Sequence, residues 1–322
     1  MADRRKPRVA IGCQGGGSHA AFTAGVLRRL LEPDLLARFE LLALSGTSGG
    51  AVCAALAWSG LIAGGAGEAA RRLLGFWRDV AADDPLDAAM NAWGLWLAHL
   101  PVTAEVSPYL YEPAAEPALR ALLGRHLRLE ELPRDPARRA RPALLVAAAD
   151  ILEGGGRIFS GEDLAYDDII ASAAIPPLFR AVATRGSLFW DGLFSHNPPV
   201  RAFTDLPERP DEIWIVRINP RRRDAAPRSM PQIIDRRNEL SGNLSLDREL
   251  DFIEKINALR EKYPALQADY KEIALREVEL DLDLDYPSKF DRSPALIERL
   301  LAHGAAAAPR LLAPASLRPR RA

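Results

Sequence analysis

The sequence predicts an α/β fold in which a mostly parallel sheet lies between two layers of helices. Within residues 8–58, a short apolar run, a glycine-containing turn and a helical stretch follow one another twice. This alternation is typical of parallel sheets, because each crossover helix packs on a face of the sheet. The chain has 322 residues, of which 48% are hydrophobic, and this is enough for one large domain.

The first strand–turn–helix unit occupies residues 8–31. Residues 8–13 (RVAIGC) are predicted to form a short buried strand, and three glycines follow at 15–17. Apolar residues then recur at helical spacing over 22–31, and Pro33 is placed to end that helix.

The second unit begins a few residues later. Residues 39–44 (FELLAL) predict a strand, residues 45–50 (SGTSGG) a tight turn, and residues 51–58 (AVCAALAW) an apolar helix. Residues 86–111 are rich in Trp, Leu, Pro and Tyr and show no clear period. Further strands are predicted at 143–149, 187–190 and 211–218, helices at 66–80 and 166–174, a glycine turn at 154–156, and a helix stop at Pro176 and Pro177.

The sequence changes character beyond about residue 230. Residues 232–260 are predicted to be helical and are highly charged. Residues 277–286 (EVELDLDLDY) alternate strictly, as expected of a half-buried edge strand with an acidic outer face. We therefore expect one domain over residues 1–308, with a C-terminal extension at 230–308, and a poorly ordered Pro- and Arg-rich tail at 309–322.

Charge and cysteine content exclude several classes of protein. The formal net charge of -1 gives no overall field that attracts nucleic acid, so no nucleic-acid partner is expected. Cys13 and Cys53 lie in apolar runs and predict buried free thiols rather than a disulfide framework. The first residues lack the apolar stretch of a secretory signal, and no window is apolar enough to cross a bilayer, so we expect a cytoplasmic protein.

The turn at 46–50 has the composition of a nucleophile elbow. Gly46-Thr47-Ser48-Gly49-Gly50 matches G-x-S-x-G between a strand and a helix. A serine on such a turn projects its hydroxyl above the sheet, and Gly46 and Gly50 let the backbone pass itself without Cβ clashes. The helix N-terminus also favours negative charge that develops at the hydroxyl. The alternative is a plain turn in which Ser48 caps the helix.

The glycines Gly15, Gly16 and Gly17 are candidates for an oxyanion hole. Acyl transfer needs backbone N–H groups aimed at the oxyanion of the tetrahedral intermediate, and glycines present them without an obstructing side chain. The rival interpretation is a nucleotide-binding site, because Gly15, Gly17 and Ala20 fit G-x-G-x-x-G/A. Such a site needs an acidic residue at the end of the second strand, whereas Glu40 lies near its start.

A serine nucleophile needs a base, and two arrangements are open. Asp191 precedes a glycine at the end of a short strand, and a partly desolvated carboxylate can accept the hydroxyl proton directly. Alternatively, His196 or His303 completes a triad, because the order Ser, Asp, His is available. The spacing does not decide between dyad and triad.

Together these motifs resemble the patatin-like phospholipases, a family of serine acyl hydrolases with a Ser–Asp dyad. Order and spacing agree across residues 8–220, and RNEL at 237–240 and SKF at 288–290 resemble a bacterial branch of the family. The matching segments are QGGGSHA at 14–20, the elbow at 46–50, ASAAIP at 171–176, and Asp191-Gly192 followed by Asn197-Pro198.

The resemblance implies a three-layer patatin-like fold and hydrolysis of a lipid or other acyl ester without metal or cofactor. It implies that Ser48 is the nucleophile, that Asp191 is the base, and that the glycines at 15–17 form the oxyanion hole. Three positions depart from the family pattern. His19 replaces Arg or Lys, Ala20 replaces Gly, and Leu193 replaces Gly or Ala and adds bulk beside Asp191.

These departures leave a second class open, a non-catalytic lipid- or granule-binding protein on the same scaffold. The aromatic residues Trp93, Trp96, Tyr109 and Tyr111 fit an acyl pocket, peripheral contact with a membrane or lipid surface, or packing under the sheet. The sequence leaves the ester substrate, its chain length and the oligomeric state open.

Overall fold

The computed structural model describes residues 5–98, 106–139, 141–176, 178–285 and 287–313. In these ranges, eight strands form one mixed sheet in which hydrogen-bonded neighbours follow the path β5-β6-β3-β2-β1-β7-β8, and β4 pairs with the edge of β3 opposite β2 and β6. The pairs β1–β2, β2–β3, β1–β7 and β7–β8 are parallel, and the pairs of β3 with β4, β3 with β6 and β5 with β6 are antiparallel. The strands are β1 Arg8–Cys13, β2 Glu40–Gly46, β3 Ala143–Asp150, β4 Gly155–Ser160, β5 Val182–Thr184, β6 Ser187–Asp191, β7 Glu212–Arg217 and β8 Ala274–Glu279.

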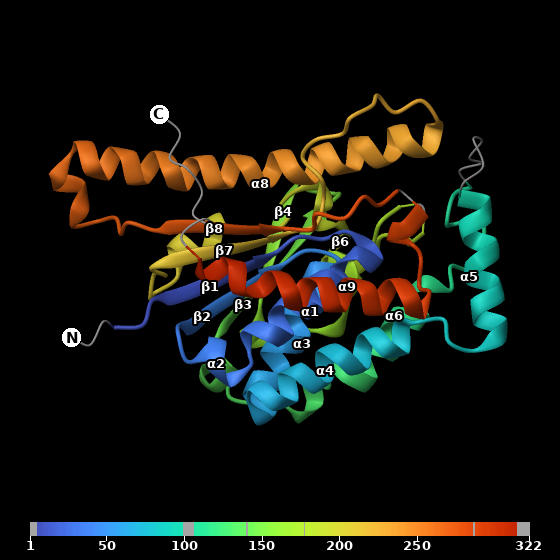
Figure 1. The fold of residues 1–322 in the computed structure, drawn as a ribbon, viewed down its shortest axis with the longest axis horizontal. Coiled ribbons are helices and arrows are strands. Elements are labelled where there is room, and N and C mark those ends of the chain that lie inside the picture. Colours follow the sequence, from blue (N-terminus) through green and yellow to red (C-terminus); the bar gives the residue numbers. More distant parts are fainter. Residues whose placement is uncertain (1–4, 99–105, 140, 177, 286, 314–322) are drawn as a thin grey trace.

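Helices cover both faces of this sheet (Figure 1). The long helix α8 lies across one face, and α1, α3, α4 and α9 pack together against the other. This arrangement confirms the predicted three-layer α/β/α sandwich. The helices are α1 Ala20–Leu30, α2 Pro33–Leu36, α3 Gly49–Gly64, α4 Ala66–Val80, α5 Pro85–Ala98, α6 Ala115–His126, α7 Tyr166–Ser172, α8 Met230–Lys262 and α9 Pro294–Ala307.

Strand β7 shows how the sequence specifies both layers. Successive side chains of a strand point to opposite faces of the sheet. Ile213 and Ile215 belong to the core that contains Leu246 of α8, whereas Trp214 and Val216 belong to the core formed with α1 and α3. All are buried, so the strand is a continuous apolar run, as expected of a strand covered on both faces.

The region without a clear period contains α5, which the sequence did not predict. Apolar residues lie on most sides of this helix, so the pattern of an amphipathic helix is absent. Trp93, Trp96, Tyr109 and Tyr111 are all exposed, so the interpretation that they pack under the sheet is wrong. The same helix lies at the end of the molecule toward which the parallel strands run (Figure 1).

Two strand predictions also differ from the structure. β4 begins inside the glycine turn predicted at 154–156, where glycine is a poor strand former and gave no signal. The strand predicted at 277–286 is observed as β8 at Ala274–Glu279, and it ends where its partner strand β7 ends, because Glu279 pairs with Arg217. The next apolar residues pack on the core without strand pairing: Leu280, Leu282 and Leu284.

The last described residues follow α9 directly. Residues Ala308–Leu312 form a 3-10 helix with Leu311 buried, so the packed part extends past the boundary expected at 309. Residues 314–322 of the expected tail and Pro177 lie outside the described residues. Cys13 and Cys53 are buried free thiols, as predicted. Across the described ranges, no helix combines the length and apolar character that crossing a bilayer requires.

Candidate active site

Ser48 lies between β2 and α3 in a strained backbone conformation. Its φ of 55° and ψ of -131° fall in a region that residues with a side chain rarely adopt. A Cβ on Gly46 would lie 2.5 Å from the carbonyl oxygen of Gly50, and a Cβ on Gly50 would overlap the carbonyl oxygen of Cys13. The turn therefore needs glycine at both positions, and it has the strand–serine–helix geometry of a nucleophile elbow.

The edges of β3 explain how the elbow and Asp191 come together. β4 pairs with Leu145–Asp150 on one edge of β3, so β2 and β6, which pair within the same stretch, both lie on the other edge. β2 pairs up to Val146, and β6 pairs antiparallel from Ala148 onward. The two strands therefore point toward each other, and the turn after β2 lies beside the end of β6.

Asp191 is a buried carboxyl in contact with Ser48. The Ser48 side chain is hydrogen-bonded to it, and the N–H of Leu193 donates to Oδ1 at 2.8 Å. Burial raises the pKa of Asp191 to about 7, and the two hydrogen bonds oppose that rise. A carboxyl with this pKa can accept and return a proton near neutral pH.

The glycine loop lies directly against Ser48. A Cβ on Gly15 would lie 2.7 Å from the Cβ of Ser48, so the two backbones are in close contact. The Gly15 N–H donates to Oδ1 of Asn197 at 2.7 Å, and this donor is therefore occupied. No acceptor in the described part of the chain engages the N–H of Gly16 or of Gly17. Two backbone donors of the predicted three are left for a ligand.

Two further side chains hold these segments in place, and the sequence assigned neither of them a role. The Ser48 N–H donates to the carbonyl oxygen of Ser172 at 3.1 Å and to its Oγ at 3.0 Å. Asn197, fully buried, joins the segment after Asp191 to Gly15. Both residues lie within the family-like segments, and that position was the signal available for them.

The ring of His196 is hydrogen-bonded to a glutamate of α8. Its Nδ1 lies 2.6 Å from Oε1 of Glu249, and no hydrogen bond between described residues joins the ring to Ser48 or Asp191. His303, the other triad candidate, pairs with Asp281 on the exposed surface. The structure therefore brings Asp191, rather than either histidine, to the serine.

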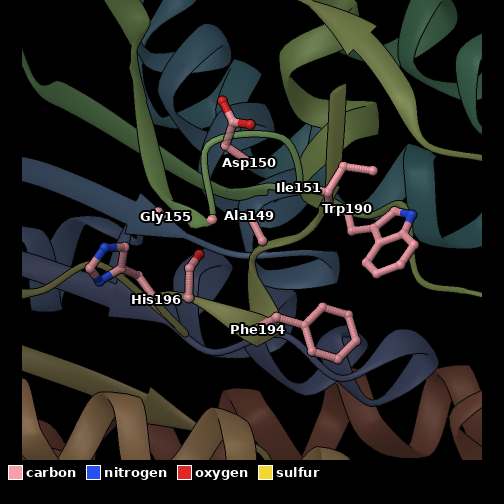
Figure 2. A pocket seen from close by; sticks show the side chains of 10 residues that line it. Ala149, Asp150, Ile151, Gly155, Trp190, Phe194 and His196 are labelled. Atoms are coloured by element: carbon pink, nitrogen blue, oxygen red, sulfur yellow. The ribbon is translucent and has the colours of Figure 1, made fainter. Parts of the chain in front are cut away.

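A cavity of about 480 Å³ lies beside β6 and is lined by His196 on one side and the rings of Trp190 and Phe194 on the other (Figure 2). Trp190 and Asp191 are adjacent on the strand and therefore point to opposite faces. Neither Ser48 nor Asp191 lines the cavity. We therefore do not assign it to the acyl group that Ser48 would receive.

The structure shows what surrounds two of the three residues that depart from the family pattern. His19 is buried with Nε2 2.7 Å from Oγ of Ser288, and burial, with the charge of Lys289, lowers its pKa to about 3. It is therefore neutral where the family carries a cation. The side chain of Leu193 is directed to α8, where its Cδ1 would lie 2.9 Å from a Cβ on Gly242.

The fold and these motifs place the chain among α/β proteins with a serine on a nucleophile elbow. The model of the patatin-like phospholipase family matches residues 13–204, and the chain belongs to this family. This match confirms the resemblance seen in the sequence. At the level of the family, it supports lipid acyl hydrolysis as the activity.

Solved structures show partial similarity. VipD from Legionella pneumophila is 12% identical with a TM-score of 0.44, and the match covers 95% of this chain and 67% of that one. The type III effector protein ExoU is 17% identical with a TM-score of 0.37, and the match covers 95% of this chain and 53% of that one. The chain thus spans about half the length of ExoU. No curated protein sequence matches the chain.

Proposed function

We propose that the chain is a serine hydrolase that cleaves lipid or other acyl esters through Ser48 and Asp191. The observation that carries this proposal is the hydrogen bond between the Ser48 side chain and the buried Asp191 carboxyl, formed beside a glycine loop. In the first step, Asp191 accepts the hydroxyl proton while Oγ of Ser48 bonds to the ester carbonyl carbon. The alcohol then leaves with the proton that Asp191 returns, and an acyl-enzyme remains.

Water releases the acyl group in the second step. Asp191 takes a proton from the water whose oxygen attacks the acyl carbonyl carbon, and Ser48 leaves with that proton as the free acid forms. Both steps pass through an oxyanion, for which we propose the N–H groups of Gly16 and Gly17 as donors. Gly15, whose N–H is bonded to Asn197, has the role of fixing the loop. Ser48, Asp191, the backbone donors and the attacking water account for every proton and charge in this scheme, so it needs no metal or cofactor.

Membership of the family supports a lipid ester as the substrate. The exposed apolar residues of α5, at the end of the molecule where β1 and β2 end, support peripheral contact with a membrane or lipid surface (Figure 1). The alternative on the same scaffold is a protein that binds lipid without cleaving it, and the neutral His19 in place of a family cation is the observation that favours it.

The test is a comparison of Ser48→Ala with Ser59→Ala. The purified full chain should hydrolyse p-nitrophenyl esters and be labelled at Ser48 by a fluorophosphonate. Ser48→Ala should lose both properties, with a fall of about 10⁶-fold in kcat. Ser59 is a buried serine of α3 whose Oγ donates to the carbonyl oxygen of Leu56 and accepts from Arg72, and its replacement should leave turnover and labelling intact in the folded protein. Retention of most activity in a folded Ser48→Ala variant would refute the proposal, and an inert, unlabelled wild type would favour the binding protein.

A further inference from the structure

Asn219 connects the end of β7 to the glycine loop. It lies two residues after the strand, is only 4% exposed, and its Nδ2 donates a hydrogen bond of 2.8 Å to the carbonyl oxygen of Gly15. Neither the motifs of the sequence nor the scheme proposed above assigns this residue a part.

The hydrogen bond to the Gly15 carbonyl also fixes the direction of the Gly16 N–H, because both groups belong to the peptide between Gly15 and Gly16. It is not among the cis peptides of the chain, and in a planar trans peptide the carbonyl and the following N–H point in opposite directions. Because the Gly15 carbonyl points to Asn219, the Gly16 N–H points away from Asn219. The Gly15 N–H on the preceding peptide is held by Asn197. Both peptides that flank Gly15 are therefore fixed, one by each asparagine.

Asn219 is itself held by a buried network. Its backbone N–H donates to Oε1 of Gln14 at 2.9 Å, and Nε2 of Gln14 donates to Oδ1 of Asn243 at 2.9 Å. Nδ2 of Asn243 donates to the carbonyl oxygen of Pro220 at 3.1 Å, and Nη1 of Arg217 donates to Oδ1 of Asn243 at 2.9 Å. The loop, the end of β7 and α8 are joined in this way, so the Asn219 amide has little freedom to turn.

We propose that Asn219 is a positioning residue that aims the Gly16 N–H at the oxyanion. Its hydrogen bond to the Gly15 carbonyl also polarises the shared peptide group, which makes the Gly16 N–H a stronger donor. Asn219 acts through the loop, since its own amide is engaged by Gly15. The inference rests on the proposed function, because an oxyanion forms only if Ser48 attacks an ester.

The test compares Asn219→Leu and Asn219→Asp with Asn257→Leu. Leucine removes the donor at similar volume, and aspartate sets an acceptor oxygen against the Gly15 carbonyl. We expect kcat to fall about 10- to 100-fold with KM little changed, which is less than the ~10²–10³-fold effect of removing a whole donor. Asn257 makes the same kind of bond, from Nδ2 to the carbonyl oxygen of Ile273 at 2.8 Å, on the C-terminal half of α8. Its replacement should leave kcat unchanged.

A second measurement separates positioning from general damage. A trifluoromethyl ketone forms a tetrahedral adduct on the serine, so its inhibition constant should weaken in proportion to the loss of kcat/KM in the Asn219 variants. Either folded Asn219 variant decides the question. Wild-type kcat in such a variant, or an equal loss in Asn257→Leu, would overturn the role of Asn219. Failure of the proposed function looks different, because wild type itself would then neither turn over ester nor label at Ser48.

Discussion

The burial of Asp191 determines how its activity depends on pH. The strand that carries it ends against Ser48, and the loss of solvent there raises the pKa of its carboxyl to about 7. The base form is the charged form, so kcat/KM should fall as pH drops below about 7 and level off above it. If a histidine with the usual imidazole pKa of ~6.5 were the base, kcat/KM would fall in the same pH region. The pH at which kcat/KM falls therefore does not by itself separate a dyad from a triad.

Substitutions at Asp191 and His196 make that separation. Asp191→Asn keeps the shape and removes the proton acceptor, so kcat/KM should fall by about 10⁴-fold or more. His196→Gln should cost less than about tenfold, because its ring is bonded to Glu249 and not to the serine. The measurement is kcat/KM for both folded variants from pH ~4 to ~9. A collapse of activity in His196→Gln would establish a triad and remove Asp191 as the sole base.

Among the elements, α5 is joined to the described part of the fold by Asp87 and Asn91, which lie one turn apart on the same side of the helix. Asp87 pairs with Arg292, and Asn91 bonds to Asp291 and to the N–H of Arg292. The residues left outward include Met90, 63% exposed, and the tryptophans at 93 and 96. The helix contains neither Lys nor Arg, so its contact with a lipid surface would be apolar and would not depend on anionic lipid.

We therefore expect Trp93→Ser and Trp96→Ser each to weaken binding to phosphatidylcholine vesicles by about tenfold, the loss of one buried aromatic side chain. Binding should persist at high salt, and hydrolysis of a soluble short-chain ester should not change. The control is Tyr263→Ser, because Tyr263 is also exposed but follows the C-terminal end of α8, outside α5. Equal binding of all three variants, or binding that salt abolishes, would contradict a role for α5.

The elements that the sequence predicted are those whose pattern is local. β1, β2, β3 and β7 are apolar runs bounded by polar or glycine residues, and α4 has one continuous apolar face. β4 was missed because its first residues are glycines, and α5 because its apolar residues lie all around it. Local patterns report local structure. β4 owes its conformation to its pairing with β3, and α5 is an exposed helix whose apolar residues have no amphipathic period.

The contacts of the candidate site show the same limit. The elbow could be predicted because its five residues are contiguous. Asn197 and Asn219 reach Gly15 across 182 and 204 residues, and those contacts exist only once the sheet has brought the ends of β6 and β7 beside the glycine loop. A single sequence carries no signal for such a contact, because asparagine after a strand is also common in plain turns.

At the scale of the whole molecule, the buried Asp191 links site chemistry to stability. Its pKa is about 7 in the folded chain and near its ordinary value of 3.8 when unfolded, so the folded state holds the proton more tightly. The resulting stabilisation is fully present below pH ~3.8 and is lost as pH rises through ~7. Charging this carboxyl near neutral pH therefore destabilises the fold, by about 4 kcal/mol for a shift of roughly three pKa units.

Asp191→Asn removes that titration, so the variant should gain stability relative to wild type as pH rises from ~4 to ~8. The measurement is the free energy of unfolding in urea for both proteins across this range. Asp150 is the control of opposite sign, because the N–H of Glu153, with Ser187, lowers the pKa of its exposed carboxyl. Wild type should therefore become more stable relative to the Asp150→Asn variant as pH rises through the acid range. A difference between wild type and Asp191→Asn that stays constant from pH ~4 to ~8 would show that Asp191 does not carry a raised pKa.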